Sequence, residues 1–386
     1  MIHFPPAWST WRVALAHDWL TGMRGGERVL ELLCDGFPDA PVHTLIHKPE
    51  TISARINRHP IHTSPLQSIP RIDQIYRYFL PFHPWAISRF QPKPADLLIS
   101  TSHCVAKGMP RPAGARHLCY CFTPMRYAWT FYREYFGDNP VKAALLKPVL
   151  RRLRRWDYEH AQGVDRFVAI SRHIQKRISD FYGRDSDVVY PPVDTDRCTP
   201  GPAGYEGFDL IVSALVPYKR VDLAVDAYTQ HGYPLVVVGA GTALPTLQAR
   251  AGANVRFLGW QSDEEILTLY RSCRMLIFPG EEDFGIVPVE AQACGKPVVA
   301  YGVGGATETV LDGETGIHFD TQTPAALLDA VERCAQQDWD AAHIRRHAES
   351  FSIQAFIDGL NQSIQACLDQ PATDTMPEML RQEETP

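Results

Sequence analysis

The chain has 386 residues, 45% of them hydrophobic, which is enough to fill the cores of two α/β domains of ordinary size. Its formal net charge of −6 argues against a general nucleic-acid-binding protein, so we expect no nucleic acid partner. Nine cysteines, scattered from Cys34 to Cys367 without paired metal spacing, indicate a reducing cytoplasm rather than a disulfide framework, and we expect no bound metal. The absence of a run of about 18 apolar residues and of a signal-peptide pattern also favours the cytoplasm.

The N-terminal half, residues 1–195, alternates apolar runs with turn residues, as the strands of a parallel α/β sheet do. Strands are predicted at residues 11–16, 42–46, 96–100, 117–122 and 166–171. Residues 60–94 are dense in proline and aromatic residues, which predicts a poor sheet strand. We expect this segment to form a surface that faces a substrate, with one helix at 73–79.

Two motifs of this half lie at predicted strand ends, where ligands bind in parallel sheets. Gly25 and Gly26 follow the first strand, and glycines at that place let a ligand approach the backbone closely. His103 follows the strand at 96–100 and is a candidate functional residue. The alternative for the two glycines is an ordinary turn, and the alternative for His103 is a structural role.

A basic, partly apolar stretch covers residues 140–156. Pro148 is expected to break or bend its helix, so that the contiguous cationic part begins near Val149. Such a segment predicts contact with an anionic membrane surface, and a solvated helix face is the alternative. Its cations lie within residues 142–155 and are Lys142, Lys147, Arg151, Arg152, Arg154 and Arg155.

The sequence Pro191-Pro192 resists helix and sheet alike and predicts a linker that continues to Gly207. A second α/β domain is predicted for residues 208–351, with strands at 210–215, 234–238, 255–258, 275–278 and 297–301. Residues 352–370 form the last predicted helix, and the polar residues 371–386 are expected to be a disordered tail.

Three further signals lie in the second half. Lys219 and Arg220 stand at the start of a predicted helix, where a cation opposes the helix dipole unless a phosphate lies between. The glycines after the strand at 234–238 have Leu244 at the third glycine position of a dinucleotide fingerprint, so we reject NAD as a cofactor. Ser262 and Glu265 form a predicted helix capping box.

The loop at residues 279–287 links an apolar run to a helix expected to begin near Pro288. Glu282 belongs to this loop and Glu290 to the first helical turn, so the two carboxylates can reach opposite ends of one ligand. Between them, the backbone N–H groups of residues 284–287 can hold an anion such as a diphosphate. An acidic surface loop is the alternative interpretation.

The segment EDFGIVPVE, followed by AQACGKPVVAYGVGGATETV, resembles the donor site of retaining GT-B glycosyltransferases of family GT4. The resemblance covers roughly residues 11–366 and implies two Rossmann-like domains with parallel sheets facing across a cleft. It also implies a nucleotide-sugar donor as substrate, with no separate cofactor. In that family the position of Glu290 holds the ribose and that of Glu282 contacts donor-sugar hydroxyls. The loop that binds sugar and phosphate corresponds to Asp283, Phe284, Gly285, Ile286 and Val287.

The resemblance gives roles to residues elsewhere. GT4 relatives place a lysine matching Lys219 on the diphosphate, and Arg220 is a candidate to assist because Ala214 replaces a common family arginine. Gly25 and Gly26 match a loop that faces the donor phosphates and acceptor across the cleft. Trp260 lies in a loop expected to meet the base, with interdomain contact as the alternative, and the last helix often returns to the N-terminal domain.

The segments SALVPYKRVDLAV and FTPMRYAW look most like bacterial GDP-mannose-dependent transferases of surface polysaccharide synthesis. Arg126 and Tyr127 keep that pattern as predicted substrate-binding residues, whereas Phe122 replaces a histidine of these relatives. His103, from the similar SSH motif, is therefore the better candidate near the donor sugar. We predict His103, Glu282 and Lys219 as catalytic residues and name no nucleophile, because this class has no agreed one.

The predicted reaction moves a hexosyl group to a glycan or polyprenyl-linked sugar acceptor. GDP-mannose is the preferred candidate for the donor, so that the transferred sugar would be mannose. UDP-glucose or UDP-N-acetylglucosamine as donor, an epimerase, and a non-catalytic nucleotide-sugar binder are the alternatives. The basic stretch at 142–155 predicts a cytoplasmic protein that is peripheral at the inner face of the membrane.

Overall fold

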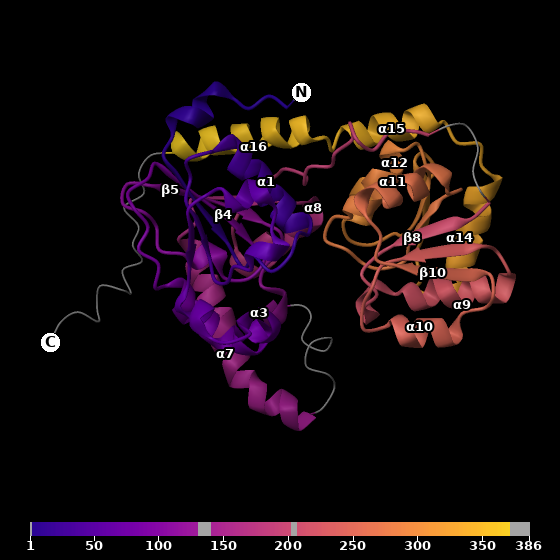
Figure 1. Cartoon of the computed structure of the whole chain (residues 1–386), viewed down its shortest axis with the longest axis horizontal. Coiled ribbons are helices and arrows are strands. Elements are labelled where there is room, and N and C mark those ends of the chain that lie inside the picture. Colours follow the sequence, from indigo (N-terminus) through magenta and orange to yellow (C-terminus); the bar gives the residue numbers. More distant parts are fainter. Residues whose placement is uncertain (1, 130–139, 202–206, 371–386) are drawn as a thin grey trace.

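The structure is a computed structural model that describes residues 2–129, 140–201 and 207–370, without the side chains of 140–146. It has two α/β domains side by side, each built on a parallel sheet (Figure 1). The predicted α/β fold with two Rossmann-like domains is therefore confirmed. Within the described residues, no helix is both long and apolar enough to cross a membrane.

The N-terminal sheet has seven strands in the order β3-β2-β1-β4-β5-β6-β7. Most of its strands are buried on both faces, as their apolar runs require in a sheet covered by helices. The strands are β1 (Val13–His17), β2 (Val42–Thr44), β3 (Ile61–Thr63), β4 (Leu97–Ser102), β5 (Arg116–Cys121), β6 (Arg166–Ala169) and β7 (Ser186–Val188).

The described helices of this domain cover both faces of the sheet or extend its edges. They are η1 (Pro6–Thr10), α1 (Gly25–Gly36), η2 (Pro49–Thr51), α2 (Ala54–Asn57), η3 (Pro65–Ser68), α3 (Ile72–Ile75), η4 (Tyr76–Phe82), α4 (His83–Ile87), η5 (Ala106–Gly108), α5 (Arg126–Trp129), α7 (Pro140–Gln162) and α8 (Arg172–Tyr182). The long helix α7 extends from the domain at the lower edge of the view (Figure 1).

The C-terminal sheet has six strands in the order β10-β9-β8-β11-β12-β13. They are β8 (Asp209–Val212), β9 (Leu235–Val238), β10 (Val255–Gly259), β11 (Leu276–Phe278), β12 (Val298–Tyr301) and β13 (Gly316–Phe319). The accompanying helices are η6 (Pro217–Lys219), α9 (Val221–His231), α10 (Leu244–Arg250), α11 (Asp263–Ser272), α12 (Ile286–Ala293), α13 (Ala306–Thr309), α14 (Pro324–Gln336) and α15 (Ala341–Glu349). The last helix, α16 (Ile353–Leu368), belongs to the N-terminal domain in space.

The strand order reverses between β1 and β4 in one sheet and between β8 and β11 in the other. Ligands of open parallel sheets bind at such reversals, outside the carboxyl ends of the strands. The predicted site residues that follow β4 and β11 therefore stand at these two positions.

The chain crosses between the domains twice, and the two crossings are hydrogen-bonded. The Val193 N–H donates to the Phe351 carbonyl at 2.9 Å, where the outgoing and returning segments meet. After this point α16 lies on the N-terminal domain, where the Phe356 ring contacts Tyr120 with 5.6 Å between centroids. The Trp8 indole also donates to Asn361 at 2.9 Å.

Two local predictions are wrong, and the break that was one of two effects predicted for Pro148 does not occur. The proline-rich region does contain a strand, β3, which stands at the edge of the sheet, and the Pro60 carbonyl accepts from the Val42 N–H at 2.9 Å. The helix expected at 73–79 is a turn of α-helix, α3, followed by the 3₁₀ helix η4 around Pro81. Helix α7 runs without a break through Pro148, because Leu150 and Leu153 bury its next turns in the core.

Two smaller differences concern the motif at 279–290. Helix α12 begins at Ile286 rather than near Pro288, since Gly285 takes a left-handed conformation (φ 100°) and ends the loop there. Glu290 therefore opens the second turn of the helix. The tail at 371–386, predicted to be disordered, lies outside the described residues.

Candidate active site

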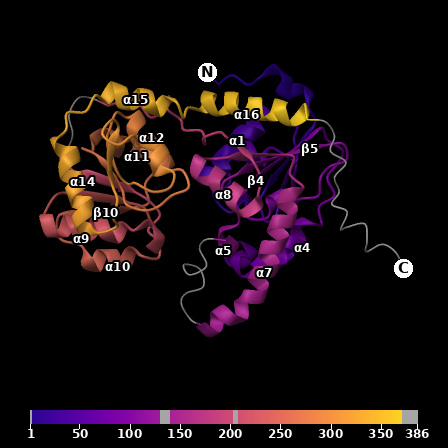
Figure 2. The ribbon, with the colours of Figure 1, turned by 180° about the vertical axis from the view of Figure 1, so that it is seen from behind.

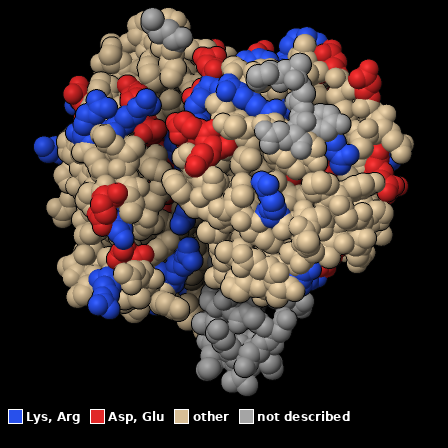
Figure 3. Space-filling model, turned by 45° about the vertical axis from the view of Figure 1, so that its right-hand side comes forward, with Lys and Arg blue, Asp and Glu red and all other residues tan. Residues whose placement is uncertain are grey.

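The candidate site lies where the loop at residues 279–285, between β11 and α12, meets the N-terminal domain. The loop passes so close to other backbone that a Cβ on Gly280 would stand 2.8 Å from the Lys219 carbonyl oxygen. Across the boundary, a Cβ on Gly25 would stand 2.8 Å from Ile286 Cδ1. The glycine loop at the start of α1 therefore faces the N-terminus of α12. Figure 3 shows acidic and basic side chains together along the boundary between the two halves.

Lys219 and Glu282 are in direct contact. Lys219 ends the 3₁₀ helix η6, and its ammonium group forms an ion pair with the Glu282 carboxylate. Their side chains are only 19% and 14% exposed, so both charges are largely withdrawn from water. Two residues predicted to serve the phosphate and sugar ends of one donor are thus adjacent.

Asp283 forms a second ion pair, and this one joins the domains. Arg126 of the N-terminal domain donates to its carboxylate, with Nε 3.1 Å from Oδ2. Arg177 of α8 donates to the other oxygen at 2.9 Å, and the Ser171 hydroxyl donates to the Asp283 backbone carbonyl at 2.6 Å. The sequence did not indicate Arg177, because its position within α8 gives no motif. Arg126 and Asp283, predicted to bind substrate, are therefore bonded to each other.

Glu290 is half-buried beside the domain boundary, where it accepts a hydrogen bond of 2.8 Å from the Tyr270 hydroxyl. Desolvation raises the pKa of the Glu290 carboxyl, and the Tyr270 hydrogen bond opposes this shift. The N-terminal domain approaches here too, since Arg28 of α1 forms an ion pair of 2.7 Å with Asp263 at the start of α11.

His103 is held by an aspartate that the sequence analysis missed. Asp18, which follows β1, is fully buried, and its Oδ2 lies 3.0 Å from His103 Nδ1. The same carboxylate accepts the backbone N–H groups of residues 103–106 at 2.6–2.9 Å. Although burial opposes its ionisation, His103 and these hydrogen bonds hold the pKa of Asp18 well below its usual range. Its place at the carboxyl end of a strand was the available signal.

Phe122, which replaces the family histidine, lies next to His103 and the glycine loop. Its ring centroid is 6.4 Å from that of His103, and a Cβ on Gly26 would stand 3.2 Å from its ring. The His103 side chain is 31% exposed. His17 is buried and its Nδ1 lies 2.7 Å from the Thr101 hydroxyl.

Three other predicted residues make the following contacts in the described part of the chain, and Arg220 reaches the loop through Gln322, which donates to the Pro279 carbonyl at 3.0 Å. Trp260 follows the outer strand β10 and is 78% exposed. The Arg220 guanidinium bonds Gln322 at 3.0 Å and Asp222 at 3.3 Å, so its assistance to Lys219 stays a prediction. Tyr127 packs against the core of the N-terminal domain.

A further contact between the domains had no sequence signal. Glu308 of α13 accepts the backbone N–H groups of Arg172 at 2.8 Å and His173 at 3.0 Å, and so caps α8 of the other domain. The Tyr190 hydroxyl donates to the same carboxylate at 3.0 Å. A negative charge at a helix N-terminus is favourable, so this contact helps to close the boundary.

The arrangement suits an anion that can exchange with carboxylates. Lys219 and Arg126 each bind a carboxylate of the loop at 282–283, and an incoming diphosphate offers the same kind of oxygen ligand. The N-terminus of α12 adds backbone N–H donors beside them. In the part of the chain that the structure describes, no group of three or more His, Cys, Asp or Glu side chains is placed to hold a metal ion.

Comparisons with known proteins agree with this geometry. The family model Glycosyltransferase Family 4 matches residues 23–197, and the model Glycosyl transferases group 1 matches residues 201–351. The chain is 32% identical over 234 residues to a D-inositol 3-phosphate glycosyltransferase of Rhodococcus erythropolis, covering 52% of this chain and 53% of the relative. It is 33% identical over 188 residues to the D-rhamnosyltransferase WbpZ of Pseudomonas aeruginosa, covering 45% and 48%. The chain thus spans about half the length of these curated relatives.

Among solved structures, Alr3699/HepE of Anabaena in complex with UDP superposes with a TM-score of 0.68 at 18% identity, covering 92% of this chain and 100% of that one. At this identity the likeness supports the GT-B fold alone. The family matches agree with the predicted glycosyltransferase class, and they leave donor and acceptor open. Residues 23–197 are similar to the Glycosyltransferase Family 4 model and residues 201–351 to the Glycosyl transferases group 1 model, so each half of the chain resembles a glycosyltransferase domain.

Proposed function

We propose that the protein is a retaining glycosyltransferase that moves a hexosyl group from a nucleotide sugar to a lipid-linked or oligosaccharide acceptor. GDP-mannose is the first candidate donor, and cell-surface polysaccharide synthesis is the proposed setting. One observation carries the proposal. Lys219, Glu282, Asp283 and the N-terminus of α12 converge beside Arg126 of the other domain.

These residues place cations where the nucleoside diphosphate would leave the sugar. As the bond to the sugar breaks, negative charge builds on the diphosphate, and cations fixed beforehand stabilise it without rearranging in the reaction step. Lys219 and Arg126 are the proposed cations, and no metal ion is proposed because these side chains can take that role. Donor binding would replace their bonds to Glu282 and Asp283, which frees both carboxylates to accept sugar hydroxyls.

The remaining donor contacts follow from position. Glu290 presents a carboxylate, already bonded to Tyr270, as the proposed ligand of the ribose. His103, oriented by Asp18, is the proposed contact to the transferred sugar from the N-terminal side. The preference for mannose and GDP rests on the segments SALVPYKRVDLAV and FTPMRYAW. The names of the two relatives, an inositol-phosphate glycosyltransferase and a rhamnosyltransferase, support sugar transfer in general.

The acceptor proposal rests on α7. Arg151, Arg152 and Arg155 are exposed on this helix, and α4 lies beside it on the same end of the domain (Figure 2). The segment η4–α4 exposes three aromatic side chains, and aromatic residues favour the boundary between water and lipid. They are Tyr78, Phe82 and Trp85, at 85%, 57% and 45%. We propose peripheral contact of this end with an anionic inner membrane face, where a lipid-linked acceptor would lie.

The test is a thermal-shift panel of GDP, UDP and ADP and their sugars, followed by a transfer assay with the donor that binds. A ligand at about 100 times its dissociation constant should raise the free energy of unfolding by about 2.7 kcal/mol. Glycosylated acceptor in mass spectra is the expected result. Conversion of donor without acceptor would identify an epimerase, and binding without either reaction would identify a nucleotide-sugar binder. Stabilisation by no member of the panel would overturn the proposal.

A further inference from the structure

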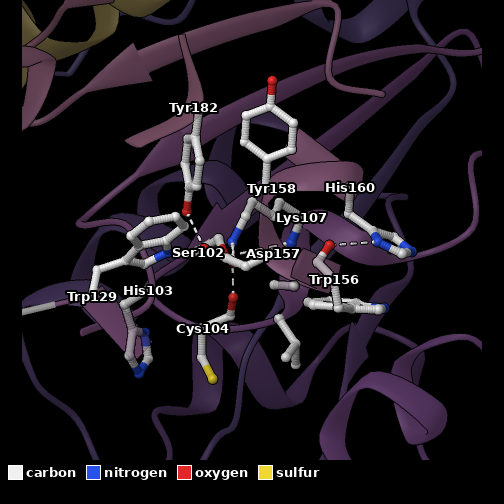
Figure 4. Close-up of polar contacts among 12 residues, drawn as sticks. Ser102, His103, Cys104, Lys107, Trp129, Trp156, Asp157, Tyr158, His160 and Tyr182 are labelled. Atoms are coloured by element: carbon white, nitrogen blue, oxygen red, sulfur yellow. Dashed lines mark hydrogen bonds and ion pairs between the residues drawn. The ribbon is translucent and has the colours of Figure 1, made fainter. Parts of the chain in front are cut away.

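A buried ion pair, Lys107 with Asp157, lies behind the candidate site (Figure 4). Lys107 is 2% exposed in η5, and Asp157 is 0% exposed in α7. The Lys107 ammonium contacts Asp157 Oδ1 and donates to the Cys104 carbonyl at 3.0 Å. The other carboxylate oxygen accepts from the Trp129 indole at 2.8 Å and from the Tyr182 hydroxyl at 2.7 Å. One carboxylate therefore binds groups from three other segments of the chain.

Stability alone gives little reason for such a pair. Desolvating two charges costs about as much as their attraction returns, and apolar residues of similar volume often stabilise a core equally well. Hydrogen bonds, however, have direction, and a fully satisfied buried network holds the groups that it joins in one arrangement. The groups that Asp157 joins therefore indicate which segments the network holds in place.

Each of the three segments also carries a residue of the candidate site. Lys107 ends the loop that begins with His103, and Asp18 fixes the same loop through the N–H groups of residues 103–106. Trp129 ends α5, which begins with Arg126. Tyr182 ends α8, which carries Arg177, a partner of Asp283.

Helix α7 is seated closely against these segments. A Cβ on Gly108 would stand 2.4 Å from the Trp156 ring, so the backbone of η5 packs directly on this side chain of the helix. On the other side, the Arg154 guanidinium donates to the Ala128 carbonyl and lies 5.8 Å from the Trp129 ring centroid. The polar network and these contacts fix the same two loops to one helix.

We propose that Asp157, through Lys107 and Trp129, is a positioning residue that sets His103 and Arg126 at the domain boundary. The proposal rests on the proposed function in one respect, namely that these two residues act on the donor. Asp157 itself touches no substrate.

The experiment compares two double variants, each of which removes an ion pair formed by a buried aspartate. Lys107→Met/Asp157→Asn removes both charges and keeps an acceptor for Trp129 and Tyr182. Arg274→Met/Asp209→Asn is the control, because Asp209 is also buried, pairs with Arg274 at 2.6 Å and accepts from the Tyr228 hydroxyl at 2.6 Å. Asp209 begins β8 and lies at the amino end of the sheet, opposite the candidate site.

The expected result is that both variants fold, whereas only the first loses turnover. Displaced catalytic groups should lower kcat by about 10- to 100-fold. Equal kcat in the two folded variants would overturn the proposal and leave the pair a structural one. Should the first variant not fold, Trp129→Phe keeps both charges and removes the hydrogen bond on the route to Arg126. It should lower kcat about threefold, and wild-type kcat there would equally overturn the proposal.

A second readout separates this proposal from the proposed function. Nitrogen-15 resonances of the His103 imidazole, assigned by comparison with His103→Gln, report its hydrogen bonding without any turnover. If the wild-type protein transfers no sugar, the proposed function fails and these resonances alone decide on positioning. Movement of the His103 resonances in the first double variant but not in the control would then support the positioning role, and unmoved resonances would overturn it.

Discussion

Glu290→Gln should weaken donor binding while leaving the fold intact or more stable. In the structure one carboxylate oxygen accepts from Tyr270 at 2.8 Å, which leaves the other available to a ribose hydroxyl. Glutamine keeps one acceptor oxygen, so Tyr270 and the ribose would compete for it. Loss of a hydrogen bond to a charged group costs roughly 1.5 to 3 kcal/mol, which corresponds to a roughly 10- to 150-fold rise in Kd.

The expected effect on stability has the opposite sign. Burial raises the pKa of Glu290, so the wild-type protein loses stability as pH rises from the ordinary glutamate range through the raised pKa. The glutamine side chain carries no charge to desolvate, and the free energy of unfolding at neutral pH should therefore stay the same or increase. A variant that binds weakly because it is misfolded would show a decrease instead.

The change in Kd can be measured by isothermal titration. The ligands are the nucleoside diphosphate and its 2′-deoxy analogue, which lacks the 2′ hydroxyl of the ribose. The wild type should discriminate between the two ligands, and Glu290→Gln should discriminate much less, because the contact to the ribose is already weakened. Glu264→Gln, the same charge change on an exposed residue of α11, is the control and should behave as wild type. Unchanged affinity of a folded Glu290→Gln protein would remove Glu290 from the site.

Four other outcomes are expected. Lys219→Ala should reduce affinity for the nucleoside diphosphate more than for the nucleoside, and equal losses in titration would contradict a phosphate role. His103→Ala should slow transfer with nearly unchanged nucleotide affinity, whereas wild-type turnover would mean that the histidine is structural. Replacing the arginines at 151, 152, 154 and 155 by glutamine should abolish sedimentation with anionic vesicles at low salt, because each contributes about 1 kcal/mol; retained binding would contradict this. Burial lowers the pKa of His117 to about 3, so the unfolded chain takes up this proton first and stability falls as pH drops below about 6.5, by about 2 kcal/mol at pH 5. Denaturant titrations at pH 7 and pH 5 should show a smaller loss for His117→Gln, which keeps an acceptor for Ser100, and an equal loss would refute this account.

Local patterns made much of the fold predictable. Strands such as β4 and β12 are apolar runs that end at polar or glycine residues, and both signals lie within a few positions of each other. The capping box at Ser262 and Glu265 forms as predicted, with Glu265 accepting the Ser262 N–H at 2.7 Å. The motif around Glu282 indicated the loop and helix that the structure contains, although it placed the helix start two residues late.

The missed features depend on contacts between distant positions. Asp157 is 50 residues from Lys107, and no spacing in the sequence relates them. Glu308 caps a helix 136 residues earlier in the chain. Pro148 was predicted to break or bend α7 because its local effect is unfavourable, and burial of the following turns keeps the helix continuous.

The paired crossings between the domains limit how the molecule can open. Because the outgoing chain at Val193 is bonded to the returning chain at Phe351, the connection acts as a double-stranded hinge rather than a flexible tether. Such a hinge resists twisting and sliding, and it favours rotation about one axis near the top of the view (Figure 1). The amplitude of that rotation grows with distance from the axis. Spectroscopic labels on α7 and α10, both far from the crossings, would thus record opening with the largest change in separation.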